Sequence, residues 1–225
     1  MSRRVVVTGL GTISALGLNT QENWDNMKKG VCGIHEITGF DHTKTKVSLA
    51  AEVDQFDANA LIGRKEAKKM DRYTQFAVVC AREAFKDADL EGKVDPERFG
   101  VILSSGIGGI GTIESEIKKA LTKGYDRISP FFIPMVISNL AAGHVAIDLG
   151  AKGMVTCVVT ACAGGTNAIG DAFRQIRDGY QDVMIAGGSE AAITPMAIGG
   201  FASMKALHEG TDPKTPLYTG LNNVK

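Results

Sequence analysis

The stretch MVTCVVTACAGGTNAIGD, Met154–Asp171, decides the fold of this chain. Its first part, MVTCVVT, is short, apolar and β-branched, which predicts a buried strand. A turn of small residues, Ala161–Gly165, follows, and apolar residues then recur at helical spacing at Ile169, Phe173 and Ile176. A strand that turns sharply into a helix through small residues is typical of a nucleophile elbow.

Cys162 lies in this turn, where the helix is expected to begin. Unpaired backbone N–H groups and the helix dipole favour a thiolate there, and they can lower a cysteine pKa from about 8.5 to roughly 3.5–7.5. We therefore expect Cys162 to be a nucleophile, with small neighbours that leave room for a substrate. The alternative is a small buried apolar residue, the interpretation we give to Cys32, Cys80 and Cys157.

Composition excludes several classes of function. The 225 residues contain 25 basic and 25 acidic side chains, so no global field attracts nucleic acid or an anionic membrane. No apolar run approaches the roughly 18 residues that span a bilayer, and the first run is too short for a signal peptide. The four cysteines form no C-x-x-C pair, which argues against a zinc site or a disulfide framework. We expect a cytoplasmic protein without a metal.

The order of expected elements indicates an α/β fold. The strands are continuous apolar runs, which predicts a largely parallel sheet with helices on both faces. Loops at the carboxyl ends of such strands carry function, and Gly106–Gly111, Cys162 and Gly187–Glu190 follow strands directly. The expected strands are 3–9, 99–104, 154–160 and 182–186, with short β pieces in 47–53, and the expected helices are 20–29, 64–89, 112–121, 134–149 and 195–207.

Two glycine-rich segments do not fit nucleotide sites. Gly9-Leu10-Gly11 follows the first strand, but Ser14 stands where a dinucleotide fingerprint has its third glycine, and no acidic residue closes a following strand. The loop Gly106–Gly111 lacks the lysine of a phosphate-binding loop, so we expect it to allow close backbone packing beside a site. A nicotinamide-binding domain is therefore disfavoured, and we expect no cofactor.

Several stretches together resemble the N-terminal half of the elongating β-ketoacyl-acyl-carrier-protein synthases, with the type II enzymes of bacterial fatty-acid synthesis most similar. They are VVVTGLG, SSGIGG, SPFFIPM, the ACAGG elbow, DVMIAGGSEA and GGFASMKAL. The resemblance runs from about residue 2 to residue 213. It implies a thiolase-like fold, of which residues 1–213 are the N-terminal domain, and a homodimer.

The resemblance also implies roles for individual residues. Cys162 aligns with the nucleophile that takes an acyl chain from acyl carrier protein, before malonyl-acyl-carrier protein loses carbon dioxide and condenses with the thioester. The backbone N–H of Cys162 is then one oxyanion-hole donor. Ile107, Phe132 and Phe201 fall where the family lines its acyl pocket, with Phe132 contributed to the partner subunit. The basic residues that fall where the acidic carrier protein docks are Lys65, Lys68, Lys69 and Lys205. From the sequence alone, the first three share one face of a helix, which is also typical of a solvated helix end.

The sequence departs from the family in its histidines. The family's two catalytic histidines lie in an H-G-T and a G-H motif, and nothing in these 225 residues matches either. The tail 214–225 also differs from the aspartate- and glycine-rich continuation that the family has, which is typical of a truncated or frameshifted end. We expect the isolated chain to accept an acyl group at best. The alternatives are an inactive fragment or a non-catalytic chain-length subunit, although such subunits replace the cysteine that is present at position 162.

Overall fold

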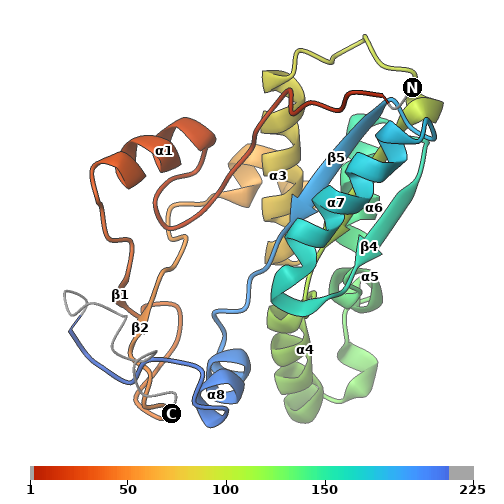
Figure 1. Ribbon diagram of the computed structural model, residues 1–225. Helices are drawn as coiled ribbons and strands as arrows, with labels where there is room; N and C mark the ends of the chain where they lie inside the picture. Colours follow the sequence, from red (N-terminus) through yellow and green to blue (C-terminus); the bar gives the residue numbers. More distant parts are fainter. Residues whose placement is uncertain (1–2, 213–225) are drawn as a thin grey trace. The chain divides into compact units, whose positions relative to one another are not determined.

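The computed structural model describes residues 3–212, which divide into two units (Figure 1). The first unit contains residues 3–12 and 57–191, and the second contains residues 13–56 and 192–212. The atypical tail expected at 214–225 lies outside the described residues.

The first unit is built on a parallel sheet of three strands. The central strand is β3 (Phe99–Ser104), which pairs with β4 (Val155–Val158) on one side and β5 (Val183–Gly188) on the other. Every residue of β3 is buried, as expected for a continuous apolar run between two helical layers. The three core strands predicted from the sequence are therefore present, but full burial is confirmed only for β3, since β4 and β5 are partly exposed.

Helices cover both faces of this sheet, as the sequence predicts (Figure 1). Val101 and Leu103 of β3 pack in one core with α3 (Arg72–Asp87) and α6 (Leu140–Leu149). Ile102, which points to the opposite face, packs against Ala168 and Ala172 of α7 (Gly164–Arg177). Each such buried aliphatic side chain contributes roughly 1.5–3 kcal/mol of hydrophobic free energy.

The strand expected at 3–9 is wrong. This segment is extended but joins no sheet, and its following residues run along α3 instead. The Leu10 N–H donates to Asp87 Oδ2 (2.9 Å), and the Thr12 N–H donates to Glu83 Oε2 (3.0 Å). Carboxylates of α3 thus satisfy backbone groups of the segment that follows the expected strand.

The helix expected at 64–89 is interrupted. A π-helical turn (Asn59–Gly63) leads into the short helix α2 (Arg64–Ala67), and α3 starts anew after its N-cap Asp71. Asp71 accepts hydrogen bonds from the N–H of Tyr73 at the start of α3, and a capping carboxylate begins a new helix rather than continuing one.

The helix expected at 134–149 is also divided. Pro134 lies inside α5 (Phe132–Val136), and α6 begins only at Leu140. Ile137 between them is extended, and its carbonyl accepts a hydrogen bond from the Tyr73 hydroxyl at 2.7 Å. A side chain of α3 therefore captures a carbonyl that a continuous helix would have used. The expected stop at Gly150 is confirmed, with the left-handed conformation (φ 73°) of a helix C-cap.

The remaining elements of the first unit are one helix close to its predicted bounds and three short 3-10 turns. The helix expected at 112–121 is α4 (Ile110–Lys123). The 3-10 turns are Pro96–Arg98, Tyr125–Arg127 and Ala161–Ala163.

The second unit combines a small antiparallel hairpin with two helices. Its elements are α1 (Thr20–Lys28), capped by Asn19, β1 (His35–Glu36), β2 (Leu49–Ala50) and α8 (Pro195–Ser203). Ile37, Val47 and Ile198 form its buried core. The helix predicted at 20–29 is confirmed, whereas the one predicted at 195–207 ends early. Across residues 3–212, every helix is too short or too polar to cross a bilayer.

Candidate active site

The carboxyl ends of the three parallel strands meet at one edge of the sheet. Ser104 at the end of β3 pairs with Val158 of β4 and with Gly188 of β5. The loops that follow the strands therefore leave from the same edge, which confirms the expected convergence of the glycine loop, the Cys162 turn and the Gly187–Glu190 segment.

Cys162 occupies the turn between β4 and α7. It is exposed, in the centre of the 3-10 turn Ala161–Ala163, and α7 begins two residues later. Ala161 has a φ of 49°, in the left-handed region that costs a non-glycine residue roughly 1–2 kcal/mol. The tight elbow predicted from the sequence is confirmed, with the backbone strain at Ala161. No side chain caps the start of α7, and the N–H of its first residue, Gly164, donates to the carbonyl of Ala161 in the turn.

Small residues let this turn approach the sheet closely. A Cβ atom on Gly164 would lie 1.8 Å from Ser104 Oγ and 2.8 Å from Ser104 Cβ. A Cβ on Gly188 would lie 3.2 Å from the Cα of Gly165. The first turn of α7 therefore rests directly on the ends of β3 and β5, which fixes the position of Cys162 relative to the sheet.

The glycine loop after β3 lies beside the Cys162 turn. A Cβ on Gly106 would be 4.0 Å from the Cα of Ala161, and the N–H of Gly109 donates to the carbonyl of Val136 in α5. Gly108 has a φ of 75°, and a Cβ there would lie 2.5 Å from the same carbonyl. The prediction that this loop allows close backbone packing beside the site is confirmed.

Glu190 holds the glycine loop in place. Its Oε2 accepts hydrogen bonds from the N–H of Gly106 (2.7 Å) and of Ile107 (3.2 Å), and its Oε1 accepts one from Ser105 Oγ (3.2 Å). Glu190 is predicted from the sequence only as part of a segment that follows a strand, without a role of its own. The sequence pattern that could predict this contact is a lone carboxylate at the end of one strand and a glycine loop, rich in N–H donors, at the end of another.

Two of the residues assigned to the acyl pocket, Ile107 and Phe132, belong to the same unit as Cys162. Ile107 lies in the glycine loop and is 38% exposed. Phe132 is half-buried and begins α5, the helix whose end the glycine loop contacts. Phe201 is in α8, which belongs to the second unit, so it is not grouped with the other two.

The single helical face expected for Lys65, Lys68 and Lys69 is not formed, so the prediction of one continuous helix through these residues is wrong. Lys65 is in α2, whereas Lys68 and Lys69 follow its end in a turn. Lys69 Nζ pairs with Glu66 at 2.8 Å. The interruption before Asp71 replaces the expected helical face with a cluster on a helix end and a turn. Lys205 is exposed and lies in the second unit.

Known proteins with similar sequences belong to one family. Residues 2–217 match the family described as beta-ketoacyl synthase, N-terminal domain. The chain is 48% identical over 215 residues to 3-oxoacyl-[acyl-carrier-protein] synthase 2 of Staphylococcus aureus strain COL, which covers 95% of this chain and 52% of that protein. It is also 48% identical over 206 residues to the protein of the same name from Synechocystis, covering 91% and 50%. The chain thus spans about half the length of these curated relatives.

Solved structures give the same result. The ishigamide ketosynthase/chain length factor matches with a TM-score of 0.86 and 28% identity, over 92% of this chain and 52% of that one. A ketosynthase in complex with the acyl-carrier protein of a type II PKS matches with a TM-score of 0.81 and 32% identity, over 93% and 51%. The fold is therefore the thiolase-like fold predicted from the sequence. This chain belongs to the beta-ketoacyl synthase family, whose N-terminal domain it contains.

Proposed function

We propose that this chain is the N-terminal part of a 3-oxoacyl-[acyl-carrier-protein] synthase of fatty-acid elongation, in which Cys162 accepts the acyl chain. The observation that carries the proposal is an exposed cysteine at the tight junction of β4 and α7. The names of the curated relatives support the same reaction. We further propose a cytoplasmic location, where fatty-acid synthesis enzymes of this type act.

The first half of the reaction needs only Cys162 and its surroundings. The Cys162 thiolate attacks the carbonyl carbon of an acyl thioester on acyl carrier protein. The bond between that carbon and the carrier's sulfur breaks, and the carrier's thiol leaves with a proton. The N–H of Cys162 stabilises the oxyanion that forms between these steps, and loss of one such donor costs about 10²–10³ in rate.

The second half of the reaction needs more groups. Malonyl-acyl-carrier protein loses carbon dioxide, and its carbanion attacks the carbonyl of acyl-Cys162. This yields a 3-oxoacyl-acyl-carrier protein two carbons longer and restores the thiolate. The family's H-G-T and G-H histidines assist this step, and acid–base assistance of this kind contributes about 10²–10⁴ in rate. We therefore expect the 225 residues alone to perform acyl transfer without condensation.

The acyl chain is assigned to a pocket that Ile107, Phe132 and Phe201 line. The proximity of the glycine loop to the Cys162 turn supports Ile107, and the contact of that loop with α5 supports Phe132. Docking of the acidic carrier protein is assigned to Lys65, Lys68, Lys69 and Lys205, of which Lys69 already pairs with Glu66. The ketosynthase neighbour solved with an acyl-carrier protein supports this class of partner.

We also propose that two copies of the chain form a homodimer. Among the described residues, β4 pairs only with β3, so it is an edge strand with backbone groups available on its other side. Val155 within β4 and Val159 directly after it are 41% and 58% exposed. An exposed apolar edge strand is normally covered by another chain or element.

The experiment that tests acyl transfer follows the mass of the intact chain after incubation with acyl-acyl-carrier protein. We expect one acyl group on the wild-type chain, none on Cys162→Ala, and an unchanged adduct on Cys157→Ala, which removes the half-buried thiol of β4. An adduct that survives Cys162→Ala would overturn the assignment. Steady release of carbon dioxide from malonyl-acyl-carrier protein by the pure chain would overturn the restriction to acyl transfer.

A further inference from the structure

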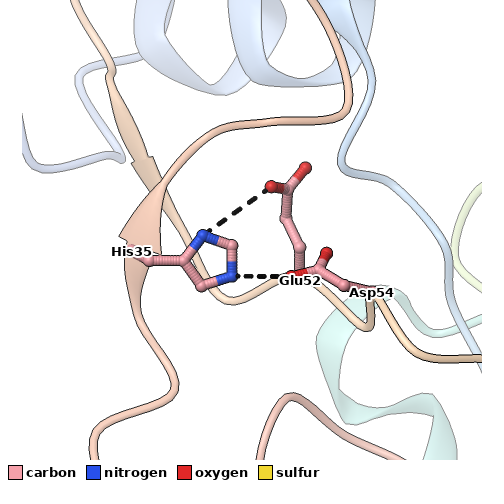
Figure 2. Close-up of side chains that lie close together, drawn as sticks. All are labelled: His35, Glu52 and Asp54. Carbon is pink, nitrogen blue, oxygen red and sulfur yellow. Dashed lines mark ion pairs between the residues drawn. The ribbon is translucent and has the colours of Figure 1, made fainter.

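A cluster of metal-ligating side chains lies on the hairpin of the second unit, outside the residues assigned to the reaction. It consists of His35 in β1 and of Glu52 and Asp54, which follow β2 (Figure 2). One ligand atom from each lies within 4.8 Å of the others. Sequence spacing alone does not indicate this cluster, because the approach of the two carboxylates to His35 depends on the pairing of β1 with β2.

The hydrogen bonds of His35 define which nitrogen is available. Its Nδ1 lies 2.8 Å from the carbonyl oxygen of Glu36, which only accepts, so Nδ1 carries a proton. Its Nε2 lies 3.2 Å from Asp54 Oδ2 (Figure 2). Nε2 is then the nitrogen left for a ligand, and a metal ion between it and Asp54 Oδ2 would bind both atoms. Metal-ligating histidines commonly donate their other N–H to a backbone carbonyl in this way.

Hydrogen bonds fix the Glu52 carboxylate close to His35 and Asp54. Its side chain is only 9% exposed, and one of its oxygens lies within 4.8 Å of the ligand atoms of His35 and Asp54. The carboxylate accepts hydrogen bonds from the N–H of Thr38 (2.7 Å) and of Gly39 (3.0 Å) and from Thr38 Oγ1 (3.0 Å). Such outer contacts orient a ligating carboxylate before an ion arrives.

A cavity gives an ion access to the cluster. It has a volume of about 480 Å³ and is lined by all three residues of the cluster and by Cys32. All of its lining residues belong to the second unit, between Ser14 and Gln55. The cavity also provides room for water molecules that would complete the coordination of an ion.

We propose that His35, Glu52 and Asp54 bind one divalent transition-metal ion of the zinc class. Imidazole nitrogen with carboxylate oxygen is a donor set that Zn²⁺ accepts, with bonds of about 2.0–2.2 Å. Neighbouring ligands of a tetrahedral ion with such bonds lie about 3.3 Å apart, close to the 3.2 Å between Nε2 and Asp54 Oδ2. The ion would link β1 to the segment after β2 and stabilise the second unit.

The test uses the full chain, freed of metal with a chelator and titrated with Zn²⁺ alone. We expect one ion per chain by calorimetry, and a rise in thermal midpoint of roughly 5–10 °C at a hundredfold excess of Zn²⁺ over the dissociation constant. His35→Gln and Asp54→Asn should each weaken binding by more than the roughly 10–100-fold cost of losing an outer contact. His42→Gln is the matched control, because His42 Nε2 faces a single carboxylate, that of Glu36, at 3.2 Å.

Several outcomes would overturn the proposal. One is the absence of a Zn²⁺-dependent heat and thermal shift in the wild-type chain, which would mean that the cluster binds no metal ion. Binding that persists in His35→Gln would assign the ion to other residues. Binding that Cys32→Ser abolishes while His35→Gln leaves it intact would identify a thiol site in the same cavity. A far-ultraviolet circular-dichroism spectrum that matches that of the wild type shows that each variant is folded.

Discussion

At the scale of a single residue, Gly164 determines how closely the turn that carries Cys162 approaches the sheet. A Cβ atom at this position would lie 1.8 Å from Ser104 Oγ, and Ser104 itself is buried at the end of β3. Because the Ser104 Cβ is also only 2.8 Å away, rotation of the hydroxyl alone cannot relieve the overlap. The start of α7 or the end of β3 must shift to accept any side chain here.

We predict that Gly164→Ala lowers the free energy of unfolding by roughly 1–3 kcal/mol, the usual cost of overpacking a core. It should also reduce acylation of Cys162, because the turn is displaced. Gly170→Ala is the control in the same helix, since a Cβ there has no neighbour within 4 Å. That change should stabilise the chain by about 0.5–1 kcal/mol, because alanine favours a helix interior. Urea unfolding compares the two, and equal effects would contradict the packing argument.

Sequence reasoning identified Cys162 but not the residues that position it. The strand, the small-residue turn and the helical spacing are local patterns, and they predict the elbow directly. The hydrogen bonds that Glu190 accepts from the N–H groups of Gly106 and Ile107 depend on which strand ends meet. The pairing of β3 with β5 brings these strand ends together, and the two strands are far apart in the sequence.

At the scale of elements, Asp71 joins two helices. Its side chain is 5% exposed, caps the start of α3 through the N–H of Tyr73, and accepts two hydrogen bonds from Thr112 near the start of α4. The carboxylate therefore faces the N-terminal ends of both helices, where a negative charge is favourable.

We predict that Asp71→Ala lowers the free energy of unfolding by roughly 2–4 kcal/mol. A lost N-cap costs about 1 kcal/mol, and loss of buried hydrogen bonds to a charged group accounts for the rest. Asn19→Ala is the comparison, because Asn19 caps only α1, through the N–H of Glu22, and should cost about 1 kcal/mol. Chemical denaturation measures both, and a similar loss in the two variants would show that the link to α4 contributes nothing.

The element boundaries that sequence reasoning missed share one cause. Residues 64–89 have helical spacing throughout, yet Asp71 starts a new helix because its carboxylate also binds Thr112. Residues 134–149 are equally helical in pattern, yet the Tyr73 hydroxyl takes the carbonyl of Ile137. The spacing of apolar residues predicts which side chains are buried. It does not predict a hydrogen-bond partner that a distant element supplies.

Asp182 links three segments of the first unit and makes its stability depend on pH. Hydrogen bonds from Arg98, which precedes β3, and from Arg3 hold the pKa of the Asp182 carboxyl well below its usual range. A pKa that is lower in the folded state adds stability that is complete above the unfolded pKa of about 3.9 and is lost as the pH falls further. Asp182 is exposed, so the contribution is modest.

We predict that Asp182→Asn has a lower thermal midpoint than wild type at pH 7, and that the difference shrinks as the pH falls below about 4. Asp178→Asn is the control, because Asp178 pairs with its neighbour Arg177 and links no distant segments. Its effect at pH 7 should be smaller. Scanning calorimetry between pH 3 and pH 8 measures the thermal midpoints of both variants and the wild type. A difference between Asp182→Asn and the wild type that grows as the pH falls would contradict the prediction.

At the scale of the whole molecule, the sequence predicts the core of the first unit better than its periphery. The central strands are continuous apolar runs, and burial on both faces leaves such runs few alternatives. The segment 3–9 also contains an apolar β-branched run, Val5–Val7, but makes no ladder among the described residues, and Val6 and Val7 are 54% and 79% exposed. Whether an apolar run becomes a strand depends on a partner strand, which composition does not specify.

The exposed edge strand makes the oligomeric state of the chain testable. We predict that Val159→Lys shifts the chain from dimer to monomer in sedimentation velocity, because a charge at the end of β4 opposes pairing of this edge with a second copy. Val159 is 58% exposed, so the lysine is not forced into the core. Met27→Lys in α1 is the matched control, since Met27 is 59% exposed and lies on a helix of the second unit. A wild-type chain that is monomeric at all concentrations, or a dimer that both variants retain, would contradict assembly through β4.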